Sequence, residues 1–399
     1  MFRNRIALAV NSGHFAVDVM NSVVPVLLAS LALSLSLSNS QIGLALTVQI
    51  FVGALSQPLF GWLADRFGGR PTVLAGAGVA WMAVCLAAAA LVPGWSLIVA
   101  LLALMALGSG LFHPIGTASA AAANPARAAS ATAVFFFSGQ VGLSLGPVLG
   151  GVLLGAGGGS AGLVALCGLA LIPALLLFSA PRPAVAVGGV ARAGRAALRV
   201  APAIVLAFVA LVAVRSSIQQ VYMSFLPKLF ADRGWDPAAY GAMAGTFMFT
   251  AAVGNIIAGD IADRFGMRAA TLWPLLLSVP AGLACLWAPN TTAAFVGSAV
   301  AGLLIGGQHS VLVVHAQRLL PVKQGFAAGL ILGFTFASGG LGTWAGGLAA
   351  DVVGLPAVMQ AVTLLALPAA ALSLTLPGRE PADAPAASAD AQDPRAETV

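Results

Sequence analysis

Charged residues are scarce in this chain of 399 amino acids. Asp, Glu, Lys and Arg together make up 8% of the sequence, whereas 60% of the residues are hydrophobic. A soluble domain of this length would need far more charge to cover its surface. Apolar stretches of roughly 20 residues, the length that crosses a bilayer as a helix, recur along nearly the whole chain. The composition therefore predicts a polytopic membrane protein, and it argues against nucleic-acid binding despite a net charge of +6.

Cysteines are few, and the common motifs of ATP-driven or catalytic chemistry are missing. Cys85, Cys167 and Cys285 lie far apart within apolar segments, which predicts small buried side chains and no disulfide framework. The sequence has no phosphate-binding loop, so ATP is not expected to be the energy source. We therefore expect no enzyme activity, no cofactor and no bound metal.

The apolar segments predict twelve spans. These are 8–33, 43–64, 72–92, 96–121, 130–156, 161–180, 203–230, 239–262, 270–288, 292–318, 325–350 and 356–376. The widest gap, 181–202, is basic and is expected to be a cytoplasmic linker between an N-terminal six-helix bundle (1–180) and a C-terminal one (203–377). The polar segment 378–399 has no apolar run and is expected to be a disordered cytoplasmic tail.

An internal repeat joins the two predicted halves. The decapeptide Gly61–Arg70, at the end of the second span, recurs as Gly259–Arg268 at the end of the eighth. We therefore predict an all-α membrane protein with twelve transmembrane helices in two parallel six-helix repeats. Acidic and basic side chains at helix ends suit a gate that pairs in one conformation and separates in the other, although they also suit simple anchoring of the topology. The gate motif comprises Gly61, Asp65, Arg66, Gly68, Arg70, Asp263, Arg264 and Arg268.

Basic residues predict the orientation of the spans. All but three of the 18 Lys and Arg residues fall on one side of a twelve-span arrangement. The exceptions are Lys228 and Arg233, on the other side, and Arg215, inside a span. Because short cytoplasmic loops carry the excess of Lys and Arg, we expect a multi-pass protein of the cytoplasmic (inner) membrane with both termini in the cytoplasm.

The decapeptide at 61–70 resembles the loop motif of the major facilitator superfamily, and its second copy at 259–268 is also expected there. Within the superfamily the chain resembles the fosmidomycin-resistance branch of drug:proton antiporters. The stretches that carry this resemblance are His14–Asp18 with Pro25, Phe112–Pro114, Gly139 with Leu145–Pro147, and Ala316–Pro321 followed by Gly325, Gly329–Leu330 and Gly339–Gly342. The branch usually has a glutamate after Phe-His-Pro, where this chain has Ile115. The resemblance implies proton-coupled drug efflux by a monomer, with details of coupling that differ at that position.

Asp18 is the one acidic residue expected deep within a span, about 15 Å from the start of the first helix. Asn11, His14, Asp18, Asn21 and Pro25 are spaced 3, 4, 3 and 4 apart, which puts them on one helical face. Ionisable groups inside a membrane are costly and mark function by default. The stripe therefore predicts the lining of a polar cavity, although hydrogen bonding to neighbouring helices would also explain it.

Histidine suits proton exchange because it titrates near neutral pH. We expect His14, one turn from Asp18, and His113 to take part in proton coupling with Asp18. His309 is a further cavity candidate, whereas His315, near Arg318, is expected to be structural.

Arg215 is the one cation expected deep within a span. It starts a stripe with Gln219 and Tyr222 on the seventh span, the counterpart of the first. Arg215 is expected to neutralise Asp18, to hold an anionic group of a substrate, or to form a purely structural ion pair. Gln140 on the fifth span is a weaker candidate for the cavity.

These patterns favour a secondary transporter that expels a small molecule in exchange for protons by alternating access. Import or facilitated passage of a metabolite or a metal cation is the alternative, with the histidines and Asp18 as ligands. A non-transporting membrane sensor is less favoured, because the gate motif is intact. The expected partners are a small-molecule substrate, protons and the lipid bilayer.

Overall fold

The computed structural model describes residues 4–67, 69–181, 201–319 and 324–376, and every regular element in these ranges is helical. This confirms the all-α prediction. The elements, with two short turns η1 and η2, are α1 (Arg5–Ser34), α2 (Asn39–Phe67), α3 (Pro71–Leu91), α4 (Trp95–Ala123), η1 (Pro125–Arg127), α5 (Ala128–Leu153), η2 (Leu154–Gly158), α6 (Gly159–Ser179), α7 (Pro202–Asp232), α8 (Pro237–Phe265), α9 (Met267–Leu286), α10 (Thr291–Gly306), α11 (His309–Leu319), α12 (Gln324–Val353), α13 (Leu355–Leu364) and α14 (Ala366–Ser373).

Eleven segments among the described residues are long and apolar enough to cross a membrane. Each corresponds to one predicted span. The remaining predicted span, 325–350, falls on α12, a helix of 30 residues. The predicted linker and tail fall almost wholly on 182–200 and 377–399, outside the described residues, so their character stays a prediction.

Two of the predicted spans are interrupted in the structure. The span over 292–318 is divided into α10 and α11 around Gly307, and the span over 356–376 is divided into α13 and α14 at Leu365. The first break lies where two chain segments approach closely: a methyl group added at Gly307 would lie 3.0 Å from the carbonyl oxygen of Gly254 in α8. Hydropathy does not register such a break, because glycine is apolar enough to continue the pattern.

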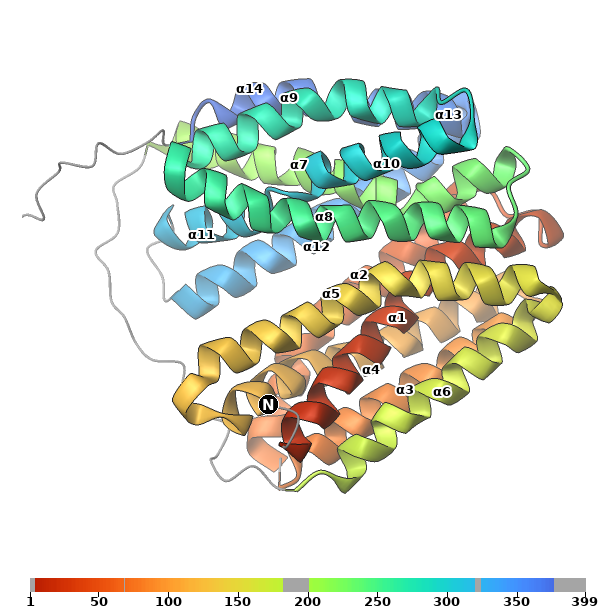
Figure 1. Ribbon diagram of the computed structural model, residues 1–399, viewed down its shortest axis with the longest axis vertical. Coiled ribbons are helices and arrows are strands. Elements are labelled where there is room, and N and C mark those ends of the chain that lie inside the picture. Colours follow the sequence, from red (N-terminus) through yellow and green to blue (C-terminus); the bar gives the residue numbers. More distant parts are fainter. Residues whose placement is uncertain (1–3, 68, 182–200, 320–323, 377–399) are drawn as a thin grey trace, which may run out of the picture.

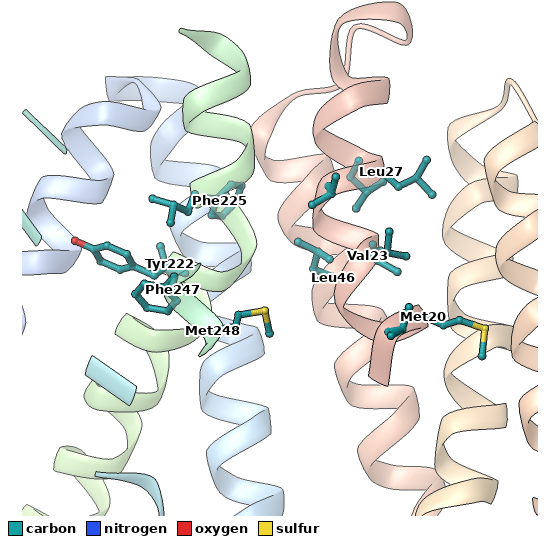
Figure 2. Close-up of a cluster of buried hydrophobic side chains, with 14 of the residues drawn as sticks. Met20, Val23, Leu27, Leu46, Tyr222, Phe225, Phe247 and Met248 are labelled. Carbon is teal, nitrogen blue, oxygen red and sulfur yellow. The ribbon is translucent and has the colours of Figure 1, made fainter. Parts of the chain in front are cut away.

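The helices form two bundles, α1–α6 and α7–α14, which lie side by side (Figure 1). In Figure 1 the bundles approach one another at the right and diverge at the left, where the N-terminus lies. One cluster of buried apolar side chains runs through both. Figure 2 shows part of it, with Met20 and Val23 of α1 on one side and Tyr222 and Phe247 of the C-terminal bundle on the other.

Contacts between the bundles gather at the end that carries the α1–α2 and α7–α8 loops. Between α2 and α12, the hydroxyl of Thr47 donates to the carbonyl of Gly340 at 2.6 Å. The Asp351 carboxylate accepts from the backbone N–H groups of Asn39 and Ser40 at 2.7 and 3.0 Å. Between α5 and α8, a methyl group added at Gly241 would lie 2.9 Å from the Cα of Gly151. Glycine therefore lets the two bundles meet backbone to backbone at this end.

Candidate functional site: a carboxylate between two histidines

The structure brings three of the predicted residues together inside the N-terminal bundle. Asp18 of α1 lies between His14, one turn earlier on the same helix, and His113 of α4. Nε2 of His14 is 3.2 Å from one carboxylate oxygen, and Nε2 of His113 is 3.6 Å from the other. Asp18 is 7% exposed and His14 is 3% exposed, so the group is largely shielded from solvent. We call these three side chains the His–Asp–His cluster.

Both imidazole rings of the cluster are held by a backbone carbonyl. Nδ1 of His14 lies 2.7 Å from the carbonyl oxygen of Phe135 on α5, and Nδ1 of His113 lies 2.8 Å from that of Ser109 on α4. A carbonyl oxygen only accepts hydrogen bonds, so each Nδ1 carries a proton and each Nε2 faces Asp18. The second nitrogen of each ring is thereby free to exchange a proton with the carboxylate.

The distance between His14 and Asp18 sets a lower limit on the protons that the cluster holds. A neutral ring with its proton on Nδ1 presents a lone pair at Nε2, and an ionised carboxylate presents lone pairs as well. Two acceptors 3.2 Å apart repel each other unless a proton lies between them. Two neutral histidines and an ionised Asp18 therefore do not account for the contact between His14 and Asp18. The contact requires one additional proton. That proton is bound either to Nε2 or to the carboxylate.

Helix α5 positions the cluster from the side opposite α4. Phe135 stacks on the His14 ring, with ring centroids 4.0 Å apart and planes inclined by 22°. Gly139, one turn later, leaves the space that the cluster occupies: a methyl group there would lie 2.5 Å from Cε1 of His14 and 2.6 Å from a carboxylate oxygen of Asp18. Only glycine fits this position without displacing one of the two side chains.

Polar neighbours extend the cluster along α1. The amide of Asn21 donates to Asp18 at 3.3 Å and to the hydroxyl of Ser109 at 3.1 Å. The carbonyl oxygen of the Asn11 side chain is buried and makes no hydrogen bond within the described residues. Ser109 was not among the predicted site residues, although its position four residues before His113 on α4 is the signal that would have found it.

Arg215 lies in the other bundle and is 2% exposed. Its guanidinium donates to the side-chain oxygen of Gln308 at 3.3 Å and to the carbonyls of Ile305 and Gly306 at 3.1 and 3.0 Å. These carbonyls end α10, where the helix dipole is negative and stabilises a cation. The expected pairing of Arg215 with Asp18 is absent from the described residues, and Gln308 is a partner that the sequence did not suggest.

The remaining predicted cavity residues are dispersed. Tyr222 is fully buried in the C-terminal bundle, where its hydroxyl contacts that of Thr363 and its ring stacks on Phe247. Gln219 and His309 are half-buried on α7 and at the start of α11, and Gln140 is exposed on α5. Ile115, in the position of the usual family glutamate, is 3% exposed and belongs to the apolar cluster.

The gate-motif residues lie at the ends of α2 and α8 and at the helix starts that follow. Gly68 and the side chain of Asp65 fall outside the described residues, so their predicted role stays a prediction. The Arg66 guanidinium lies over the Trp62 ring at 5.7 Å, and Arg70 precedes α3. In the second copy, Arg264 pairs with Asp260 at 2.9 Å and Arg268 donates to the carbonyl of Leu376, also at 2.9 Å. Asp263 is exposed nearby and Gly61 is half-buried on α2.

The His–Asp–His cluster also meets the spacing of a metal site. One ligand atom from each residue lies within 4.8 Å of the other two, and both histidines have the backbone carbonyl partner that metal-binding histidines commonly have. The sequence predicted no bound metal. Two imidazole nitrogens and a carboxylate oxygen fit a divalent transition metal as well as they fit a proton.

Comparison with known proteins agrees with this architecture. The family model of the Major Facilitator Superfamily matches the chain twice, over residues 10–222 and 208–397. The chain therefore belongs to the Major Facilitator Superfamily, and it is a membrane transporter by fold.

Two curated relatives match nearly the whole chain. The chain is 27% identical over 373 residues to the fosmidomycin resistance protein of Escherichia coli (strain K12), covering 90% of this chain and 89% of that protein. It is also 27% identical over 372 residues to the uncharacterized MFS-type transporter YfnC of Bacillus subtilis (strain 168), covering 90% of each. These matches support the predicted resemblance to the fosmidomycin-resistance branch.

Solved structures share the fold. A bacterial homologue of the human lysosomal transporter Spinster, in an inward-facing and occupied conformation, has a TM-score of 0.77 at 17% identity, over 93% of this chain and 96% of that one. The nucleoside transporter NupG has a TM-score of 0.75 at 14% identity, over 93% and 98%. At these identities the likeness concerns the fold alone.

Proposed function

We propose that this protein expels a small molecule in exchange for protons, and that the His–Asp–His cluster is the proton site. The observation that carries the proposal is the geometry around Asp18. A buried carboxylate faces two imidazole nitrogens whose opposite nitrogens are tied to backbone carbonyls. Such a group takes up a proton between Nε2 and the carboxylate while the backbone carbonyls hold both rings in place. The curated relative named for fosmidomycin resistance supports efflux as the direction.

Alternating access supplies the rest of the mechanism. The bundles are in close contact at the end of the α1–α2 and α7–α8 loops, and at the other end apolar side chains of α2 such as Leu59 and Trp62 are more than half exposed. If the termini are cytoplasmic, as the basic residues predict, this is a conformation open towards the cytoplasm. The cluster binds a proton and the carrier binds the outward-going substrate in turn. The carrier thereby exchanges one for the other.

The test replaces Asp18 by Asn, which mimics a permanently protonated carboxyl group. Inverted membrane vesicles would be loaded through an imposed pH gradient, with labelled fosmidomycin as the first probe because of the relative's name. We expect Asp18→Asn to lose gradient-driven accumulation while it keeps exchange of substrate down its own gradient. Asp236→Asn is the matched control, because Asp236 caps α8 by accepting from the N–H of Ala239 and Asn caps equally well. Full gradient-driven accumulation in Asp18→Asn would overturn the proposal.

A metal cation is the second candidate for the transported species, and the spacing of the cluster favours it over other imported substrates. Uptake of labelled Zn²⁺ or Co²⁺ by right-side-out vesicles, abolished by His113→Ala, would support it. Proton release on metal addition without metal uptake would instead mean that the metal merely competes with the proton. The gate-motif role, the monomeric state, the inner-membrane location and the absence of nucleic-acid binding remain parts of the same proposal.

A further inference from the structure

Two adjoining hollows lie where α9 ends and α10 begins. The larger is a groove of about 750 Å³ between the two helices, and the smaller, about 280 Å³, lies against the end of α7. Both are lined by Pro289 and Asn290, so they adjoin at the connection between α9 and α10, and we call the pair the depression. Neither contains a residue of the His–Asp–His cluster or of the gate motif.

The larger groove is apolar and opens outward. It is lined by the small residues Ala281, Ala284, Ala293 and Gly297, and Val296, 59% exposed, forms part of its wall. Helices α9 and α10 both belong to segments that are apolar and long enough to cross a membrane. An apolar groove on the outside of such helices is in contact with acyl chains in the bilayer.

The smaller hollow carries the polar groups. Arg233 donates to the carbonyl of Leu286 at 2.7 Å and lies over the Phe230 ring at 5.0 Å. Within the described part of the chain Arg233 has no carboxylate at ion-pair distance, whereas Lys228 on the same helix is paired with Asp232. Thr291 also lines this hollow. Arg233 is therefore a cation with hydrogen-bonding capacity to spare.

Tryptophans mark the level of the depression in the membrane. Trp287 lies along the groove and is 62% exposed, and Trp235 lines the hollow of Arg233. Exposed tryptophans gather at the depth of lipid headgroups. Arg233 therefore lies at the depth of the lipid phosphates. The groove extends from this level towards the middle of the bilayer along α9 and α10.

We propose that this depression binds one phospholipid, with its phosphate on Arg233 and Thr291 and one acyl chain in the groove between α9 and α10. Arginine forms forked hydrogen bonds with phosphate, and a cationic side chain at headgroup level attracts an anionic headgroup. The depression joins α7, α9 and α10, so a bound lipid links three helices of the C-terminal bundle. The proposal is independent of the transported substrate.

Native mass spectrometry of the purified full-length chain tests it by titration with phosphatidylglycerol. We expect Arg233→Gln to weaken the tightest lipid adduct by about fivefold, the effect of one basic group near a headgroup. Arg233→Lys should retain part of the binding. Ala284→Phe should weaken it as well, because the ring fills the groove. Arg264→Gln, which removes a paired cation at the far end of α8, is the matched control and should bind as the unaltered chain does.

Folding is checked for each variant by its elution from size-exclusion chromatography, and Arg233→Lys serves where Arg233→Gln does not fold. Equal affinities for the unaltered chain, Arg233→Gln and Ala284→Phe would overturn the proposal. An equal loss of binding in Arg264→Gln and Arg233→Gln would also overturn the proposal, because lipid binding would then depend on net charge alone. Retention in Arg233→Gln together with loss in Ala284→Phe would also refute the phosphate contact.

Discussion

The Asp351 carboxylate bridges the two bundles at the end where they meet, so its removal should favour opening of that end. It accepts at 2.7 and 3.0 Å from the N–H groups of Asn39 and Ser40, the first residues of α2. A carboxylate at a helix N-terminus, bonded to otherwise unpaired N–H groups, stabilises the contact by about 1 kcal/mol. Because the contact exists only while the bundles touch, Asp351→Ala should shift the balance towards the opened end by about fivefold.

Spin labels at positions 34 and 292 measure that shift, because both residues are exposed at this end and lie in different bundles. The three native cysteines are buried, so they compete little for the label. We expect the fraction of long distances to rise in Asp351→Ala and to rise less in Asp351→Asn, which keeps one acceptor. Asp232→Ala is the control, since Asp232 pairs within α7. An unchanged distance distribution in Asp351→Ala would refute the reasoning.

The pH dependence of this contact follows from the same hydrogen bonds. Partial burial raises the pKa of Asp351, but hydrogen bonds from the hydroxyl and N–H of Ser40 and the N–H of Asn39 lower it more, so the net pKa lies below the ordinary 3.8. A lowered pKa means that the contact is stabilised above pH 3.8 and weakens only as the pH falls through the lowered value. The shift in label distances caused by Asp351→Ala should therefore have the same size from about pH 5 to pH 8, whatever the His–Asp–His cluster contributes in that range. A shift that disappears as the pH falls from about 8 to about 5 would contradict the lowered pKa.

Three further predictions concern the cluster and the topology. Gly139→Ala should abolish gradient-driven transport because its methyl group displaces His14 or Asp18. Gly168→Ala is the control and should transport normally, because no atom lies within 4 Å of its added methyl group. Equal activity of the two variants in the vesicle assay would contradict the packing around Gly139. Arg215→Met and Asp18→Asn should have additive effects on thermal stability, to within about 0.5 kcal/mol, because the two side chains share no contact. Strong coupling in a double-mutant cycle would show that they interact. Cysteine at position 126 should be labelled only from the cytoplasm and cysteine at position 34 only from outside; the reverse pattern would refute the orientation.

Most of the fold could be predicted from the sequence because the bilayer imposes a minimum length on every apolar segment. The twelve spans emerge from that constraint, and the duplicated decapeptide relates the halves. The break at Gly307 could not be predicted in this way, because the groups next to it, Gly254 and Arg215, come from other helices. The same holds for the Asp351 contact, since Asp351 and Asn39 are more than 300 residues apart in the chain.

The site was predicted unevenly for a related reason. Spacings of three and four place His14, Asp18 and Asn21 on one face of α1 whatever surrounds the helix. Packing sets the rotation of each helix about its own axis. That rotation decides which neighbouring helices contact this face of α1. His113 therefore required the family motif, and Phe135, which holds His14 through its backbone carbonyl, left no side-chain pattern to read. Tyr222 shows the opposite case, a residue on the expected stripe that packs inside its own bundle.

The two halves use the same pair of helices for opposite charges. In the first half α1 supplies Asp18 and α4 supplies His113; in the second half their counterparts α7 and α10 supply Arg215 and the carbonyls that hold it. The repeat preserves the decapeptide at the ends of α2 and α8, where the proposed gate lies. At the centre the halves differ: the proposed proton site lies in the first half, and a second one would add another buried ionisable group at considerable cost. On the proposed function the cluster is negative only after it releases its proton, whereas Arg215, 2% exposed, stays a buried cation of the other bundle.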